Sequence, residues 1–99
     1  MLRKMYEPVV CKSGFQMSVQ ASEFNYCSPR ENGAPKYTEV EIGMPSMTEP
    51  MLLEYAEDPG NPTGTVYAWV PSQVVTNVIA KHGGIVSGEL PPGIPFLSV

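Results

Sequence analysis

Residues 70–84 read VPSQVVTNVIAKHGG, and they decide the fold because their apolar residues are spaced as on one face of a helix. The stripe consists of Val74, Val75, Val78 and Ile79. Lys81 and His82 would complement the negative end of the helix dipole, and Gly83 would supply the left-handed residue that commonly ends a helix. The stretch therefore predicts one helix over about residues 72–82.

Outside this stretch, apolar residues alternate with polar ones, which is typical of strands. The clearest case is FQMSVQAS at residues 15–22, where one face of the strand would enter the core. Ser13 and Gly14 precede it and predict a hairpin with the strand before. TVYAWV at residues 65–70 is apolar on both faces, which predicts a central strand. The expected strands cover residues 7–12, 15–22, 36–43, 50–56, 65–70 and 84–90.

Length and composition indicate a single α+β domain over residues 1–99. A chain of 99 residues suits one compact core, and its eleven prolines and nine glycines interrupt it too often for a helical bundle. We expect an antiparallel sheet of about five or six strands with the helix packed on one face. The sheet residues that should meet the helical stripe are Val19, Val40, Ile42, Leu53 or Val66. EDPGNPTG at residues 57–64 predicts an exposed loop.

Residues 91–99, PPGIPFLSV, predict a proline-rich C-terminal tail within the same domain. Its larger apolar residues are Ile94, Phe96, Leu97 and Val99. Because a free tail of this kind would expose an apolar patch, we expect it to pack on its own domain or on a second copy of the chain. The second arrangement would make the protein a homo-oligomer.

Charge and cysteine content narrow the setting of the protein. A formal net charge of −4, with Arg3 and Lys4 as the one cationic cluster, argues against direct nucleic-acid binding. No apolar run approaches the roughly 18 to 20 residues of a membrane span, and no signal-peptide pattern follows the first residue. Cys11 and Cys27 are too few for a disulfide scaffold, so we expect a cytoplasmic protein. A bridge between these two cysteines stays an open alternative.

Residues that could carry catalysis are few. His82 is the one histidine, and an interaction with the helix end explains it better than a catalytic role. Cys27 and His82 could pair as nucleophile and base, but nothing near Cys27 in the sequence activates its thiol. Zinc ligands are not clustered, and the glycines form no phosphate-binding loop. We therefore expect no enzyme activity, no cofactor and no metal.

A binding surface is the stronger candidate, and YCSPRENGAPKY at residues 26–37 is its first location. The candidate residues are Tyr26, Arg30, Asn32, Lys36 and Tyr37. Two cations flank an Asn-Gly turn with a tyrosine on either side, so the loop could present a guanidinium, backbone N–H groups and an aromatic face to an anionic or nucleotide ligand. The plainer alternative is an exposed turn whose tyrosines pack on neighbouring strands.

The second candidate location is the acidic edge formed by Glu54, Glu57 and Asp58. These carboxylates could hold calcium or magnesium, but their spacing is not that of an EF-hand, and a solvated loop edge explains them better. Loops held on a scaffold are nonetheless where binding groups commonly lie. We expect Trp69, in the most apolar strand, to lie in the core or at an interface.

Four stretches together resemble small uncharacterised proteins encoded by bacteriophages and prophages. They are MSVQAS, YCSPR, YAEDPGNPTGTVY and VVTNVIAKHGG, and the likeness runs over about residues 14–90. The resemblance implies an anti-defence role in the host cytoplasm, such as binding and blocking a CRISPR effector. It carries no set of functional residues and no common mechanism.

The sequence thus favours a non-enzymatic binding protein of phage type that inhibits a bacterial immune component by protein contact, as anti-CRISPR proteins do. One alternative is an oligomeric sponge that sequesters a nucleotide immune signal near Arg30 and Lys36. Another is a small virion or assembly protein whose tail grips a neighbouring subunit. The partner is therefore expected to be a host protein, a small nucleotide or a second copy of the chain.

Overall fold

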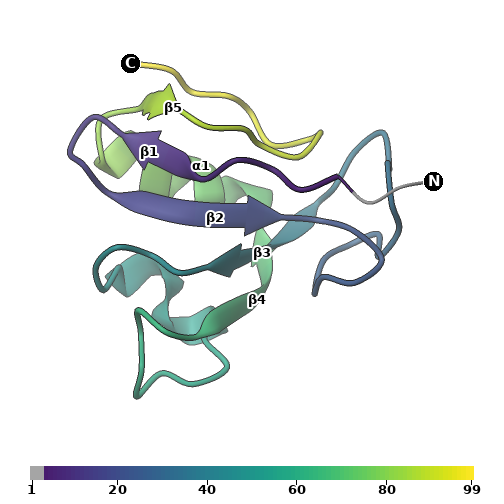
Figure 1. Cartoon of the computed structure of the whole chain (residues 1–99), viewed down its shortest axis with the longest axis horizontal. Coiled ribbons are helices and arrows are strands. Elements are labelled where there is room, and N and C mark those ends of the chain that lie inside the picture. Colours follow the sequence, from purple (N-terminus) through teal and green to yellow (C-terminus); the bar gives the residue numbers. More distant parts are fainter. Residues whose placement is uncertain (1–3) are drawn as a thin grey trace.

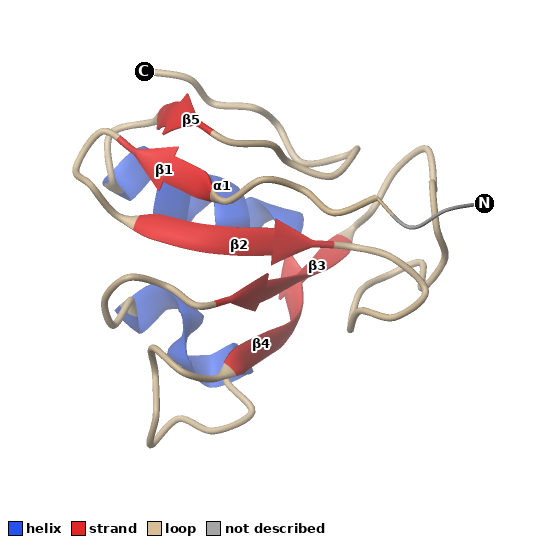
Figure 2. Cartoon of the chain, viewed as in Figure 1, coloured by secondary structure: helices blue, strands red, loops and turns tan. Residues whose placement is uncertain are grey.

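The computed structural model describes residues 4–99, which form a single sheet with one α-helix behind it (Figure 1). The sheet has five strands in the order β4-β3-β2-β1-β5, and each adjacent pair is antiparallel. In chain order the elements are β1 (Val9–Cys11), β2 (Gln16–Gln20), β3 (Glu39–Gly43), the 3-10 helix η1 (Pro50–Tyr55), β4 (Val66–Pro71), α1 (Ser72–Lys81) and β5 (Ile85–Ser87). The loops gather at the ends of the strands (Figure 2). The predicted α+β fold is confirmed.

β1 and β2 form the predicted hairpin, in which Val9 lies opposite Met17. Gly14 in the connecting turn has a φ of 96°, a left-handed conformation that glycine adopts without steric cost. β2 then pairs with β3, where Val19 lies opposite Ile42. Because side chains alternate along a strand, this pairing places the apolar residues of β2 and β3 on the same face.

The predicted helical stripe packs on that apolar face. The fully buried residues include Val75, Val78 and Ile79 of α1 and Val19, Val40 and Ile42 of the sheet. Two of the expected partners, Leu53 and Val66, are only partly buried, and Leu52 is the leucine with no exposed surface. The helix follows β4 without a loop, so the chain leaves the edge of the sheet and returns directly behind it.

Residues 50–56 do not form the predicted strand. Residues 50–55 form η1, whose first turn is fixed by Glu49, because the Glu49 carboxylate accepts a hydrogen bond from the Met51 N–H at 2.8 Å. Pro50 suits the start of a helix because it has no N–H to leave unpaired there. The apolar run of this segment therefore supplies one core residue, Leu52, instead of one face of a strand.

β4 is an edge strand and not the predicted central strand. Its pairing with β3 shifts between Val40 and Ile42, where the residues opposite them are Val70 and Tyr67. The shift is a bulge, and Trp69 within it has a φ of 47°. A bulge turns a side chain away from the regular alternation, which explains why both faces of this segment can be apolar at the edge of the sheet.

The C-terminal tail packs on its own domain along the outer side of β5. The Ile85 N–H donates to the Leu97 carbonyl, and the Val99 N–H donates to the Ile85 carbonyl, so the end of the tail runs parallel to β5. Ile94 is buried. Phe96, Leu97 and Val99 remain exposed after this packing. Figure 1 shows the tail as the outermost segment on this side of the sheet.

Cys11 and Cys27 are both buried free thiols. Burial raises the pKa of each thiol, which keeps it in the unreactive neutral form. Cys27 donates a hydrogen bond to the Ser22 carbonyl at 3.2 Å, and no contact joins it to His82 among the described residues. Neither helix within residues 4–99 has the length and apolar content that a bilayer crossing requires.

Candidate functional site

Residues 22–30 lie against β3 on the face of the sheet opposite α1. Glu41 of β3 holds this segment, because its carboxylate accepts hydrogen bonds from the Tyr26 N–H at 3.1 Å and from the Asn25 amide at 2.9 Å. Ser28 donates a further bond to Glu39 at 2.7 Å. The loop is therefore fixed on the strand, and the side chains that it presents are held in place.

Three large side chains meet on this face, and we call them the aromatic stack: Arg30, Tyr26 and Trp69. The Arg30 guanidinium lies 5.0 Å from the centre of the Tyr26 ring, and the Tyr26 and Trp69 ring centres are 5.1 Å apart. The backbone N–H of Trp69 also donates to the backbone carbonyl of Tyr26 at 3.0 Å. A cation over an aromatic ring and two tilted rings in contact are both attractive arrangements.

Trp69 is 44% exposed although it belongs to the most apolar strand. Of the two places expected for this residue, the core is therefore wrong, and an interface stays a prediction. The left-handed backbone of Trp69 in the β4 bulge turns the indole out of the core and towards Tyr26. Nothing in the local spacing of TVYAWV indicates this, because the bulge depends on pairing with β3.

The other predicted residues of the 26–37 loop lie apart from the stack. Tyr37 is fully buried, and its hydroxyl donates to the Glu31 carbonyl at 2.7 Å, so its ring is not available to a ligand. The Asn32 side chain accepts from the Glu23 N–H at 3.0 Å and so has a structural role in the loop. Lys36 is exposed and lies beside Gly93 of the tail. The structure therefore brings together Tyr26 and Arg30 of the five candidates.

The acidic edge runs from η1 into the loop before β4. Glu54, Glu57 and Asp58 are all exposed. The Asp58 carboxylate accepts from the Gly60 N–H at 3.2 Å, and the Glu57 N–H donates to the Val66 carbonyl. Within residues 4–99 no three side chains of the His, Cys, Asp or Glu type come together as a metal ion would need.

A polar cluster around the buried Glu49, which the sequence did not indicate, links α1 to η1 and to the β1–β2 turn. Glu49 is only 1% exposed and binds Lys81 at 2.9 Å and His82 at 2.8 Å. The other ring nitrogen of His82, Nδ1, lies 2.9 Å from the Ser13 hydroxyl oxygen. We call this the Ser13–His82–Glu49 chain. Lys81 and His82 thus have a specific carboxylate partner in addition to the helix end for which they were predicted.

Two features hold this chain in place. Phe15 stacks on the His82 ring with the centres 4.2 Å apart and the planes at 15°. Burial by itself would raise the pKa of Glu49, but hydrogen bonds from the Met51 N–H, Lys81 and His82, together with the charge of Lys81, outweigh it and hold the pKa below its usual value. Glu49 is therefore a buried, ionised carboxylate. Its position just before Pro50, as a helix cap, was the one local signal that could have identified it.

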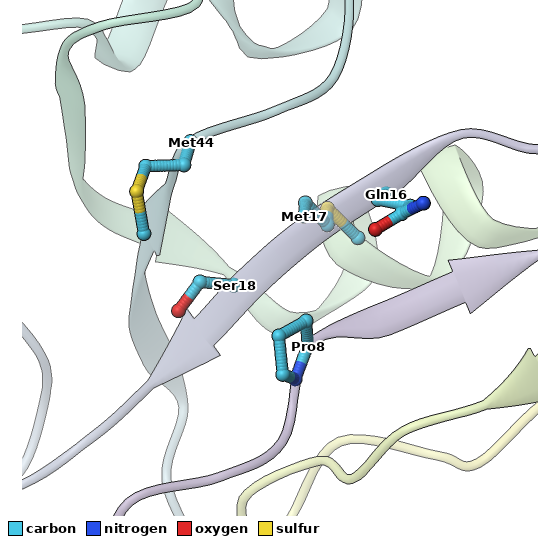
Figure 3. A pocket seen from close by; sticks show the side chains of 5 residues that line it. All are labelled: Pro8, Gln16, Met17, Ser18 and Met44. Carbon is cyan, nitrogen blue, oxygen red and sulfur yellow. The ribbon is translucent and has the colours of Figure 1, made fainter.

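A small hollow of about 200 Å³ lies on the sheet between β1 and the loop after β3. Figure 3 shows Pro8 and Met44 at its sides and Ser18 of β2 between them. Pockets for small organic ligands are generally larger, at roughly 300 Å³ or more, and carry several convergent polar groups. This hollow holds neither a charged side chain nor a predicted site residue, so it does not define the site.

The fold and these surfaces define a small α+β protein with a fixed stack of one cation and two aromatic rings on the face away from its helix. Comparison with known protein families, with curated proteins and with solved structures found no match for the chain. The functional argument therefore depends on the surfaces of this chain alone.

Proposed function

We propose that this chain is a non-enzymatic binding protein that inhibits a bacterial immune component by protein contact, with the aromatic stack as its contact surface. The observation that carries the proposal is the outward position of Trp69, which is 44% exposed in a left-handed backbone conformation. Such a conformation costs a bulky residue about 1 to 3 kcal/mol and tends to occur where a side chain has a task.

The composition of the stack supports a protein partner. Trp, Tyr and Arg are the residues that most often carry the binding energy of protein interfaces. Here they are already in contact with one another, and Glu41 fixes the backbone beneath Tyr26. Because little side-chain freedom is left to lose, a partner could bind them at a low entropic cost. The resemblance to phage proteins supplies the host immune component as the expected partner.

The nucleotide sponge has less support from the geometry. It needs convergent cations near a phosphate, but Arg30 lies against the Tyr26 ring while Lys36 lies beside the tail. A nucleotide that binds the native protein would raise its melting temperature, because ligand binding shifts the folding equilibrium. A clear rise with one member of a nucleotide panel would replace the proposed protein partner by a nucleotide.

The stack can be tested by removing its largest ring. Trp69→Ala should weaken binding to the partner by about 2 kcal/mol, or roughly 30-fold in Kd, because a central tryptophan is typically a dominant contact. The partner is identified by pull-down from a bacterial lysate, purified, and titrated calorimetrically. Phe96→Ala is the matched control, since it removes an exposed aromatic ring from the tail. Equal binding by wild type and Trp69→Ala would refute the proposed surface.

A second candidate, an assembly protein that binds a copy of itself, is favoured by the outer edge of the sheet. Natural sheet edges are usually protected by charge, yet this edge exposes Val86, Phe96, Leu97 and Val99. The tail residues 91–99 contain no charged side chain. Two copies, each of net charge −4, could therefore approach here with less repulsion than at their acidic surfaces.

This second candidate predicts that Leu97→Asp changes the oligomeric state. Leu97 is exposed in one chain, so a carboxylate there would leave the fold intact but would be desolvated between two copies. Light scattering after gel filtration should show an oligomer for the wild type and a monomer for the variant. Met44→Asp, at an exposed position away from the tail, should behave as the wild type. A monomeric wild-type protein would eliminate this candidate.

A further inference from the structure

The Ser13–His82–Glu49 chain lies away from the aromatic stack. The chemistry of its three side chains determines which atom carries the proton in each of its two hydrogen bonds. An ionised carboxylate can only accept, so the bond of 2.8 Å requires His82 Nε2 to carry a proton and donate it to Glu49. In the neutral ring, Nδ1 is then an acceptor, and the Ser13 hydroxyl 2.9 Å away donates to it. This assignment follows from the hydrogen-bond partners.

With the protons placed in this way, the free lone pair of the His82 ring faces the Ser13 hydroxyl, as it must for a histidine to act as a base towards a serine. Glu49 fixes the tautomer of the ring, and the stacked Phe15 ring fixes its plane. The nucleophile and base are within hydrogen-bond reach, and so are the base and the group that orients it. Serine, glutamate and histidine follow one another along the chain in the order known from α/β-hydrolase triads, but the fold is a different one, so the geometry of the roles is the criterion for such a site.

Ser13 is open to an incoming reagent. The residue is exposed, and a methyl group at the neighbouring Gly14 would meet no atom within 4 Å. A serine oxygen has two lone pairs, and one of them accepts the Phe15 N–H at 3.2 Å. The second lone pair remains for attack while the proton faces His82. Lys12, also exposed, places an ammonium group one residue away on the same turn.

We propose that Ser13 is a nucleophile that accepts an acyl group from an activated ester, with His82 as the base and Glu49 as a positioning residue. The Ser13 oxygen attacks the carbonyl carbon while its proton passes to His82 Nδ1. The bond between that carbon and the leaving oxygen then breaks, and the leaving group takes the proton from His82 or departs as an anion. The products are acyl-Ser13 and the free alcohol or phenol.

The reaction stops at the acylated protein. The backbone N–H groups of residues 12–15 all have acceptors: those of Lys12, Ser13 and Gly14 donate to the carbonyls of Gly84, His82 and Cys11, and that of Phe15 donates to Ser13. None of these donors is free to stabilise an oxyanion, which is usually the largest contribution to turnover. The acyl-serine is an ordinary ester with a poor leaving group, so water removes it slowly. Ser13 is therefore a modification site and is compatible with a non-enzymatic function.

The test uses the full chain with p-nitrophenyl acetate. One equivalent of p-nitrophenolate should appear in a burst with no sustained turnover, and peptide mapping should place the acetyl group on Ser13. Ser13→Ala should abolish the burst, and His82→Gln should slow it about 100-fold, which is a typical contribution of a general base. Glu49→Gln should slow it by less, because it removes only the positioning group.

Ser46→Ala is the matched control, since Ser46 is an exposed serine whose hydroxyl accepts from the Gln16 N–H and has no histidine beside it. This variant should react as the wild type does. Circular dichroism establishes that each variant is folded, and the mapping of the wild-type protein needs no variant at all. Acetylation confined to lysines, or Ser13 labelled no faster than Ser46, would overturn the proposal.

Discussion

Glu49→Ala is expected to lower the free energy of unfolding by about 3 kcal/mol, because several groups lose their partner at once. The Met51 N–H at the start of η1 and the largely buried His82 ring would both be left without an acceptor. Lys81 loses its carboxylate as well, but its side chain is 46% exposed and water can replace the contact. The change also leaves a gap between η1 and the end of α1, to which packing adds a further cost.

The loss should be measured by urea unfolding at neutral pH, with Glu54→Ala as the matched control. Glu54 is an exposed glutamate of η1, so its removal tests the effect of helix propensity and net charge without the buried contacts. Its variant should lie within about 0.5 kcal/mol of the wild type, as exposed substitutions generally do. A similar stability of both variants would show that the Glu49 contacts contribute little to the fold.

The same carboxylate gives the protein a pH-dependent stability. The pKa of Glu49 is lower in the folded protein than its ordinary value of 4.5, so the unfolded chain binds the proton more readily. The stability from the ionised group is therefore complete above about pH 4.5 and declines as the pH falls through the lower pKa of the folded state. Glu49→Gln cannot ionise, so the difference between its unfolding free energy and that of the wild type should shrink between pH 6 and pH 3, a range chosen to span this titration. A constant difference would contradict this sign.

The parts of the fold that the sequence predicted are those that depend on neighbours along the chain. The helical stripe from Val74 to Ile79 and the Ser13-Gly14 hairpin have local spacing or turn signals, and both are present. The strand predicted over residues 84–90 is present in its first part only, as β5 (Ile85–Ser87). The geometry of helices and β-hairpins depends on residues close together in the chain, so a single sequence contains most of the information needed to predict them.

The two wrong elements depend on distant contacts. The predicted strand over residues 50–56 is replaced by the 3-10 helix η1 over residues 50–55, because Glu49 caps this helix and is itself held by Lys81 and His82 at the C-terminal end of α1. β4 lies at the edge of the sheet, and the alternation of side chains along a strand does not predict the order of the strands. Tertiary contacts of this kind override local propensity.

The sequence predicted only part of the candidate site, because some of its contacts join segments that are distant in the chain. Tyr26 and Arg30 are four residues apart in one loop, and the contact between their side chains follows from that closeness. Trp69 joins them only through the bulge opposite β3, so its place in the most apolar strand predicted the core or an interface and not a contact with Tyr26. The Ser13–His82–Glu49 chain joins three distant segments, and only the cap position of Glu49 marks it locally.

Gly88→Ala is the other substitution with a large expected effect, a loss of about 3 kcal/mol or more. Gly88 follows β5 and has a φ of 118°, a conformation that strains any residue with a side chain. A Cβ atom there would also lie 2.7 Å from the Val9 Cα and 2.9 Å from the Pro8 carbonyl carbon, as well as against the Pro8 oxygen. These are backbone atoms at the start of β1, so no side chain can rotate away and the two segments must separate.

Gly14→Ala separates the two causes, because Gly14 has a similar φ of 96° but open space around the position of the added methyl group. This variant should lose only the conformational cost, about 1 to 2 kcal/mol. The excess loss in Gly88→Ala, measured by urea unfolding of both variants, then reports the close contact between the segment after β5 and β1. Equal losses would mean that the backbone around Gly88 moves away from β1 without further cost. The segment after β5 would then be held on β1 more weakly than its hydrogen bond from the Glu89 N–H to the Glu7 carbonyl indicates.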